Sequence, residues 1–250
     1  MLQIVSSKQS TPVRLSNALV FISVIDGQTG KSRAAYTAFF GIFPCGLFMD
    51  FLALVALAAI GLHFLRRRDQ HARIALLGSR LAPYRIEPQM ETLLDGYLRW
   101  LDEADVDRRR QIWQTLSATE QSLAEQLRRF AADVAGLEAP LAQVSKLPMW
   151  LPWAQPLLSG RLLFDVRRAF AIHAEGVAAV AANEPGLDDK ARAYMMSAEL
   201  LLLQHTCHWF CRSKTVAGAR LLARHGTSYT QVLASVSPRT RDAYVALTGR

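Results

Sequence analysis

The sequence contains little cysteine: only Cys45, Cys207 and Cys211 in 250 residues. This count does not make a disulfide framework and is typical of a reducing compartment. Residues with β-branched side chains are also sparse after position 60, whereas alanine and leucine dominate there. Because this composition favours helices over sheet, we expect an all-α protein.

The sequence also lacks the short motifs that mark several common enzyme classes. It contains no G-x-S-x-G, S-x-x-K, H-E-x-x-H, C-x-x-C or G-x-G-x-x-G pattern. The sequence therefore contains no local motif that would indicate a serine hydrolase, a zincin or a Rossmann enzyme. Catalytic residues can still meet from distant parts of a chain, so an enzyme stays open as an alternative to the favoured non-enzymatic protein. No cofactor is predicted.

Acidic residues are scarce near the C-terminus. Residues 208–250 hold seven arginines and lysines against the single acid Asp242, in a chain whose net charge is +8. Such a basic tail attracts the phosphates of anionic lipid or of nucleic acid. Anionic lipid is the favoured partner of the two, because the chain also carries a predicted membrane anchor. A solvated helix face is the alternative.

One long run, residues 47–65, is apolar apart from Asp50 and His63 near its ends and is followed at once by Arg66, Arg67 and Arg68. A helix of this length covers about 28 Å, close to the hydrocarbon thickness of a bilayer. The run is therefore predicted to be a single transmembrane helix. A cleaved signal peptide is the rival interpretation, which the arginines directly after the run disfavour.

The basic residues around the run predict its orientation. Six arginines lie within about twenty residues after it, against two basic residues close to it on the other side. The positive-inside rule then places the C-terminal body in the cytoplasm. We therefore expect a single-pass protein of the cell inner membrane, with the lipid bilayer and a membrane-associated protein as partners.

The composition divides the chain into four segments. Residues 1–46 lack helical periodicity and are expected to be a poorly ordered tail. Met49 offers an alternative start, in which case residues 1–48 would be dispensable. The other segments are the anchor at 47–65, a basic juxtamembrane linker at 66–83 and an irregular helical bundle at 84–250.

Two features predict how the bundle is organised. Ser117 and Glu120 match a capping box, which predicts a helix start at residue 117, after a separate helix over 106–116. A long helix is expected over 188–214. Because its centre is apolar almost all round, it should be the buried central helix.

The stretch HTCHWFC gathers His205, Cys207, His208 and Cys211 in seven positions. On a helix these four side chains can line one broad face. Three of them could hold zinc if a fourth ligand, such as His173 or His225, came from elsewhere, and a histidine could ligate haem iron. Packing in the core is the favoured interpretation, because free cysteine is among the most buried residue types and structural zinc sites usually take ligands from two separate elements.

Taken together, these features favour a membrane-anchored helical protein that acts as a non-enzymatic scaffold, accessory subunit or interaction module. Two alternatives stay open. One is a metal- or haem-dependent membrane enzyme that uses the cluster at residues 205–211. The other is an anchored binder of anionic lipid or nucleic acid that uses the basic tail.

Overall fold

The computed structural model describes residues 45–149 and 160–249, with side chains from residue 50 onwards. Residues 1–44 of the predicted tail lie outside the described residues. The chain divides into two compact units, Met1–Leu54 and Val55–Arg250, and the helical body belongs to the second. The helices are α1 (Cys45–Leu81), α2 (Ile86–Asp102), α3 (Val106–Ala135), α4 (Ala139–Ala142), α6 (Val166–Ala181), α7 (Asp189–Cys211), α8 (Lys214–His225), α9 (Tyr229–Ser235) and α10 (Pro238–Thr248). The prediction of an all-α protein is thereby confirmed.

Helix starts in the body are set by short polar side chains that accept hydrogen bonds from free backbone N–H groups. The Asp105 carboxylate accepts from the N–H groups of Asp107 and Arg108 at the start of α3. The Asp188 carboxylate accepts from the N–H of Ala191, at 2.7 Å, at the start of α7. These caps recur along the chain, so most helix starts are encoded locally.

The predicted helix start at residue 117 is wrong. Helix α3 runs without a break from Val106 to Ala135, so Ser117 and Glu120 lie inside it. The backbone N–H groups that a capping box would satisfy are already bonded within the helix. Glu120 is instead fully buried, where it bonds side chains of two other helices.

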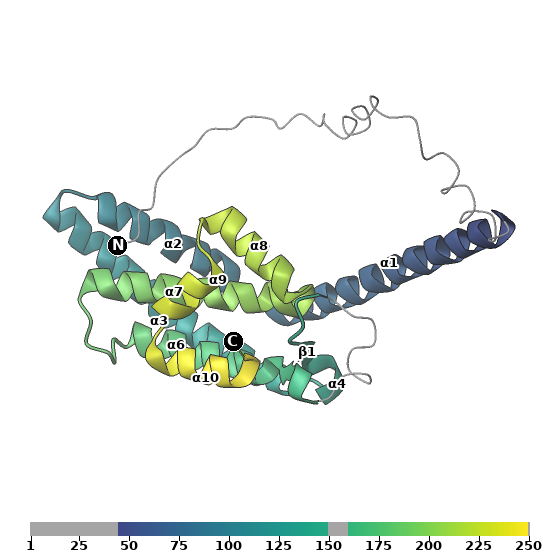
Figure 1. Cartoon of the computed structure of the whole chain (residues 1–250). Coiled ribbons are helices and arrows are strands. Elements are labelled where there is room, and N and C mark those ends of the chain that lie inside the picture. Colours follow the sequence, from purple (N-terminus) through teal and green to yellow (C-terminus); the bar gives the residue numbers. More distant parts are fainter. Residues whose placement is uncertain (1–44, 150–159, 250) are drawn as a thin grey trace, which may run out of the picture. The chain divides into compact units, whose positions relative to one another are not determined.

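The helices of the body pack around α7, as predicted for the long apolar segment. Helix α7 contacts α2, α6, α8 and α9, while α3 packs against α2 and α6, and α10 packs against α6 (Figure 1). Large side chains from α3, α6 and α7 meet in the core, where Phe130 and Phe170 lie edge to face with ring centroids 5.0 Å apart. The central position of α7 therefore follows from an apolar surface on nearly every side of it.

A short β-hairpin was not expected from the sequence. Strand β1 (Gln143–Ser145) pairs antiparallel with β2 (Leu163–Asp165), which follows the 3-10 helix η1 (Gly160–Leu162). The hairpin is fixed to α7, because the indole N–H of Trp209 donates to the Ser145 carbonyl at 2.9 Å. Phe164 packs edge to face on the same indole ring. Three-residue strands carry too little periodicity to be read from sequence.

Helix α1 continues as one helix through the segment predicted as a juxtamembrane linker, as far as Leu81. Its later turns contact the body. The Arg73 guanidinium donates to the carbonyl oxygens of Gln143 and Phe210, and it lies over the Phe210 ring at 5.3 Å from the centroid. Leu77 is buried. Among the residues that the structure describes, no helix combines the length and the apolar character needed to cross a bilayer.

Candidate functional site

The cluster at residues 205–211 occupies the last two turns of α7, and its four side chains have different surroundings. His205 is 1% exposed and stacks on the Tyr229 ring, with centroids 4.6 Å apart. His208, Cys207 and Cys211 are half-buried, and the two cysteines pack against the core. Within the described ranges, no three histidine, cysteine or acidic side chains are placed to hold a metal ion.

The two thiols of the cluster are protonated near neutral pH. Burial raises the pKa of Cys207, and the neighbouring Cys211 raises it further. Burial likewise raises the pKa of Cys211 to about 11, against the opposing effect of Arg73. Because the thiolate is the form that attacks electrophiles and binds metals, both cysteines have the character of packing residues.

The two histidines of the cluster line a cavity of about 340 Å³ between α7 and α8. We call it the α7–α8 pocket. Leu221 and Ala223 contribute its apolar part. Its polar lining consists of Gln204, His205 and His208 from α7 and Arg220 and Arg224 from α8.

Arg220 and Arg224 make the pocket electropositive, and its two histidines are uncharged near neutral pH. Burial lowers the pKa of His205 to about 4, with further contributions from Lys214 and His208. Burial also lowers the pKa of His208, with Arg220 as the next cause. Arg220 Nη1 lies 3.3 Å from His208 Nδ1. Both imidazoles are therefore neutral at pH 7, beside guanidinium groups that stay charged.

His205 has an unusual place in this pocket. Neither of its ring nitrogens has a hydrogen-bond partner among the described residues. A buried polar group without a partner costs about 1–3 kcal/mol, so such groups are rare in folded proteins. The sequence predicted His205 as a candidate site residue, but it did not indicate that arginines of α8 line the same pocket.

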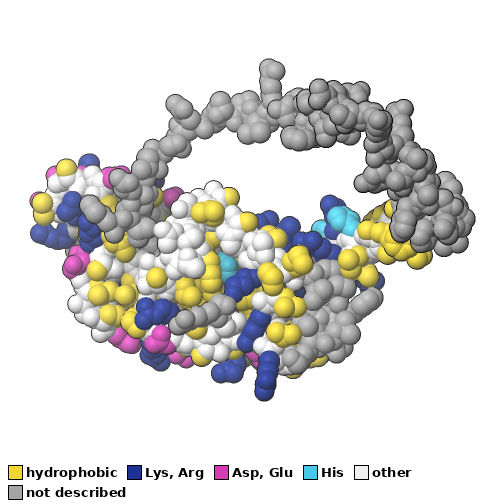
Figure 2. Space-filling view, in the orientation of Figure 1, with side chains coloured by type: hydrophobic (Ala, Val, Ile, Leu, Met, Phe, Trp, Pro, Cys, Tyr) yellow, Lys and Arg dark blue, Asp and Glu magenta, His cyan; other side chains and the backbone are white. Residues whose placement is uncertain are grey.

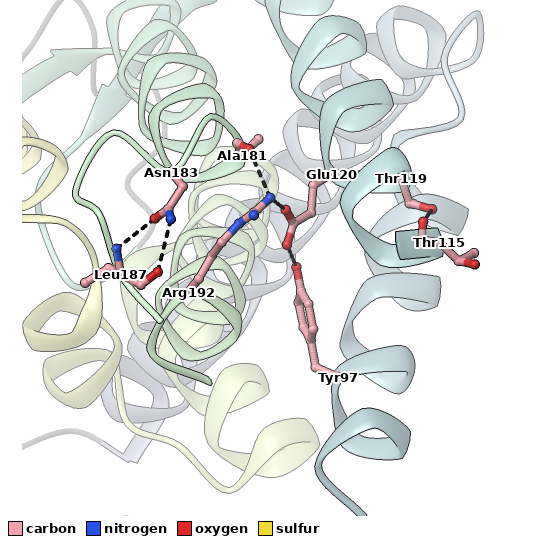
Figure 3. A network of polar contacts seen from close by, with 8 residues as sticks. All are labelled: Tyr97, Thr115, Thr119, Glu120, Ala181, Asn183, Leu187 and Arg192. Atoms are coloured by element: carbon pink, nitrogen blue, oxygen red, sulfur yellow. Dashed lines mark hydrogen bonds and ion pairs between the residues drawn. The ribbon is translucent and has the colours of Figure 1, made fainter. Parts of the chain in front are cut away.

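A second polar group lies in the core, and no local sequence pattern indicated it. Figure 3 shows the carboxylate of Glu120 on α3 between Tyr97 of α2 and Arg192 of α7. The Tyr97 hydroxyl donates to one carboxylate oxygen, and Arg192 forms an ion pair with the other. Arg192 also donates to the carbonyl of Ala181 at 3.0 Å and lies over the Trp113 ring. The network joins α2, α3 and α7 in the interior, and the bond to Ala181 connects it to α6.

A third buried polar group joins α6, α7 and α10. His173 Nε2 lies 2.8 Å from the Thr206 hydroxyl, which lies 2.8 Å from the Tyr244 hydroxyl. Near it, the Glu199 carboxylate accepts from the backbone N–H of Ser237 at 3.1 Å. All these groups are buried. They hold the C-terminal helix α10 onto the core.

The buried His173 predicts a loss of stability in acid. Burial lowers its pKa from 6.5 to about 3. The unfolded chain therefore binds this proton first, and stability falls as the pH drops below about 6.5. Between pH 7.5 and 4.5 the wild type should lose about 2.5 kcal/mol more than the His173→Gln variant, at about 1.4 kcal/mol per pH unit.

Denaturant unfolding of both proteins at several pH values measures this difference. Glutamine keeps a polar group towards Thr206 but cannot titrate, so the other buried ionisable groups contribute equally to both curves. Parallel curves for the two proteins would contradict the prediction.

No protein-family model, curated protein or solved structure matches this chain, so its function has to be inferred from the residues described above.

Proposed function

We propose that the protein is a membrane-tethered, non-enzymatic interaction module whose α1 inserts residues 47–65 into a bilayer. One observation carries the proposal. From Phe51 to Leu65, all nine large apolar side chains of α1 are exposed, and they lie on every side of the helix. Figure 2 shows hydrophobic side chains gathered on this part of α1. A helix that is apolar all round is stable only when something apolar surrounds it.

The charges next to this segment support lipid as its surroundings. Arg66, Arg67 and Arg68 are all exposed and follow Leu65 directly. Three arginines at one end of an apolar helix match the lipid phosphates and the positive-inside pattern. With residues 47–49, whose side chains the structure does not describe, the run reaches the length of the hydrocarbon layer, and its two ionisable residues, Asp50 and His63, lie near its ends.

The link between this segment and the body is a continuous helix. Arg73 lies eight residues beyond Leu65, which is about 12 Å along the helix axis, and it bonds the Gln143 and Phe210 carbonyls of the body. A helical connection of this kind holds the body close to the bilayer surface. Such placement suits a protein that meets a membrane-associated partner.

The interaction role is supported by what the ionisable side chains of the body do. Glu120 and His173 join helices in the core through Arg192 and Thr206, and burial keeps the two thiols of α7 protonated by raising their pKa. These groups serve folding. Among the described residues, no three histidine, cysteine or acidic side chains are placed to hold a metal ion.

Fractionation and a topology reporter test the proposal. The full chain should sediment with membranes and resist alkaline carbonate extraction. A reporter fused to the C-terminus should be active if it is one that works in the cytoplasm, and inactive if it is one that works only outside the cytoplasm. Recovery of the full chain in the soluble fraction would refute the tether, and a reporter active only outside the cytoplasm would reverse the orientation.

A further inference from the structure

The α7–α8 pocket combines a buried donor with two arginines. His205 is almost fully buried and lines the pocket with no partner for either ring nitrogen. A neutral imidazole carries one N–H donor. Both ring nitrogens are closed to a water-sized probe, so a ligand oxygen would reach this donor only where the side chains around it move apart, and there it would relieve the cost of leaving the donor unpaired.

The charged groups around this histidine define what kind of ligand fits. None of the described residues that line the pocket is acidic. Arg220 donates towards His208 Nδ1, which leaves the other ring nitrogen of His208 as a donor. Arg224 pairs with Glu91 at 3.3 Å, but both side chains are more than 60% exposed. An exposed pair of this kind is weak and exchanges readily for a stronger anion.

We propose that the α7–α8 pocket is a binding site for a phosphate group. Two guanidinium groups match a doubly charged anion, and arginine binds phosphate oxygens through paired hydrogen bonds. His205 and His208 would donate to the same oxygens. A cavity of about 340 Å³ exceeds a bare phosphate and lies at the lower end of the range for small-molecule sites. The natural ligand is therefore a small phosphorylated molecule or the headgroup of an anionic lipid.

Calorimetric titration of the full chain in neutral detergent tests the site, with inorganic phosphate as the probe and ionic strength held constant with chloride. Phosphate should bind with saturation at one site per chain. Arg224→Gln should weaken the affinity at least tenfold, because it removes one of the two guanidinium groups. His205→Phe should weaken it comparably while keeping the aromatic contact with Tyr229.

Arg239→Gln is the matched control. Arg239 is an exposed arginine paired with an exposed Glu175, as Arg224 is with Glu91, but it lies on α10 outside the pocket. Its substitution should leave the affinity unchanged. Equal weakening by Arg224→Gln and Arg239→Gln, or no saturable binding, would overturn the proposal. Arg224 is at the surface, so this comparison holds even if His205→Phe impairs folding.

A second experiment, in bilayer discs, distinguishes a lipid headgroup from a soluble phosphorylated molecule as the natural ligand. The full chain is placed in phosphatidylcholine discs with or without phosphatidic acid, and inorganic phosphate is titrated again. If phosphatidic acid suppresses phosphate binding to the wild type, the site takes a lipid headgroup. If it does not, the site takes a soluble phosphorylated molecule.

Discussion

Replacing both Leu57 and Ile60 with lysine is expected to move the protein from the membrane to the soluble fraction. Both side chains are more than half exposed and lie near the centre of the proposed span. On the insertion scale, each exchange of an apolar residue for lysine near the helix centre costs roughly 3 kcal/mol. The pair therefore costs about 6 kcal/mol, and lysines this far from either end reach the headgroups poorly.

Leu222→Lys provides the control for this experiment. Leu222 is 56% exposed on α8, so the same exchange is made at an exposed apolar position of the body. This variant should stay in the membrane fraction. If the double variant stays there as well and resists carbonate extraction, α1 is not the tether. The purified chain should also float with lipid vesicles when no other protein is present. This result would exclude a partner protein as what surrounds the apolar turns of α1.

Replacing Arg192 with methionine is expected to destabilise the protein by about 3–5 kcal/mol, because it leaves the buried carboxylate of Glu120 without its cation. Glu120 is fully buried, and Arg192 is 11% exposed at its side chain. Tyr97 still donates to the carboxylate, but one neutral hydrogen bond does not replace the ion pair (Figure 3). Denaturant unfolding at pH 7 measures the loss.

A second substitution isolates the cause of this loss. Glu120→Gln in the Arg192→Met background removes the unpaired charge while keeping an oxygen for Tyr97, so it should recover much of the stability. Arg224→Met breaks an exposed pair and should cost at most about 1 kcal/mol. A double variant that is no more stable than Arg192→Met would show that the loss comes from packing and not from charge.

The same variant should respond to pH. Burial raises the pKa of Glu120, and Arg192 opposes that effect in the wild type. Without Arg192, the raised pKa means that the folded protein takes up this proton before the unfolded chain does. The destabilisation is therefore largest above the raised folded pKa and shrinks as the pH falls from there towards the unfolded pKa of the carboxyl group.

The helical class and the central role of α7 were determined by the sequence alone, because both depend on local patterns. Composition and apolar spacing are properties of short segments, and the apolar surface of α7 allows only a buried position. The apolar character of α1 is likewise read directly from residues 47–65. Whether lipid surrounds them is the question for fractionation.

Only the tertiary structure decided which polar side chains meet. The capping signal at Ser117 was locally valid, but burial of Glu120 against Arg192, 72 residues away, favoured a continuous α3. The hairpin depends on Trp209, which is 64 residues from its bonding partner Ser145. His205 shares a pocket with Arg220 and Arg224 only because α8 packs along α7. Contacts over such separations leave no periodic trace in the chain, since they depend on how the helices pack and not on the spacing within any one of them.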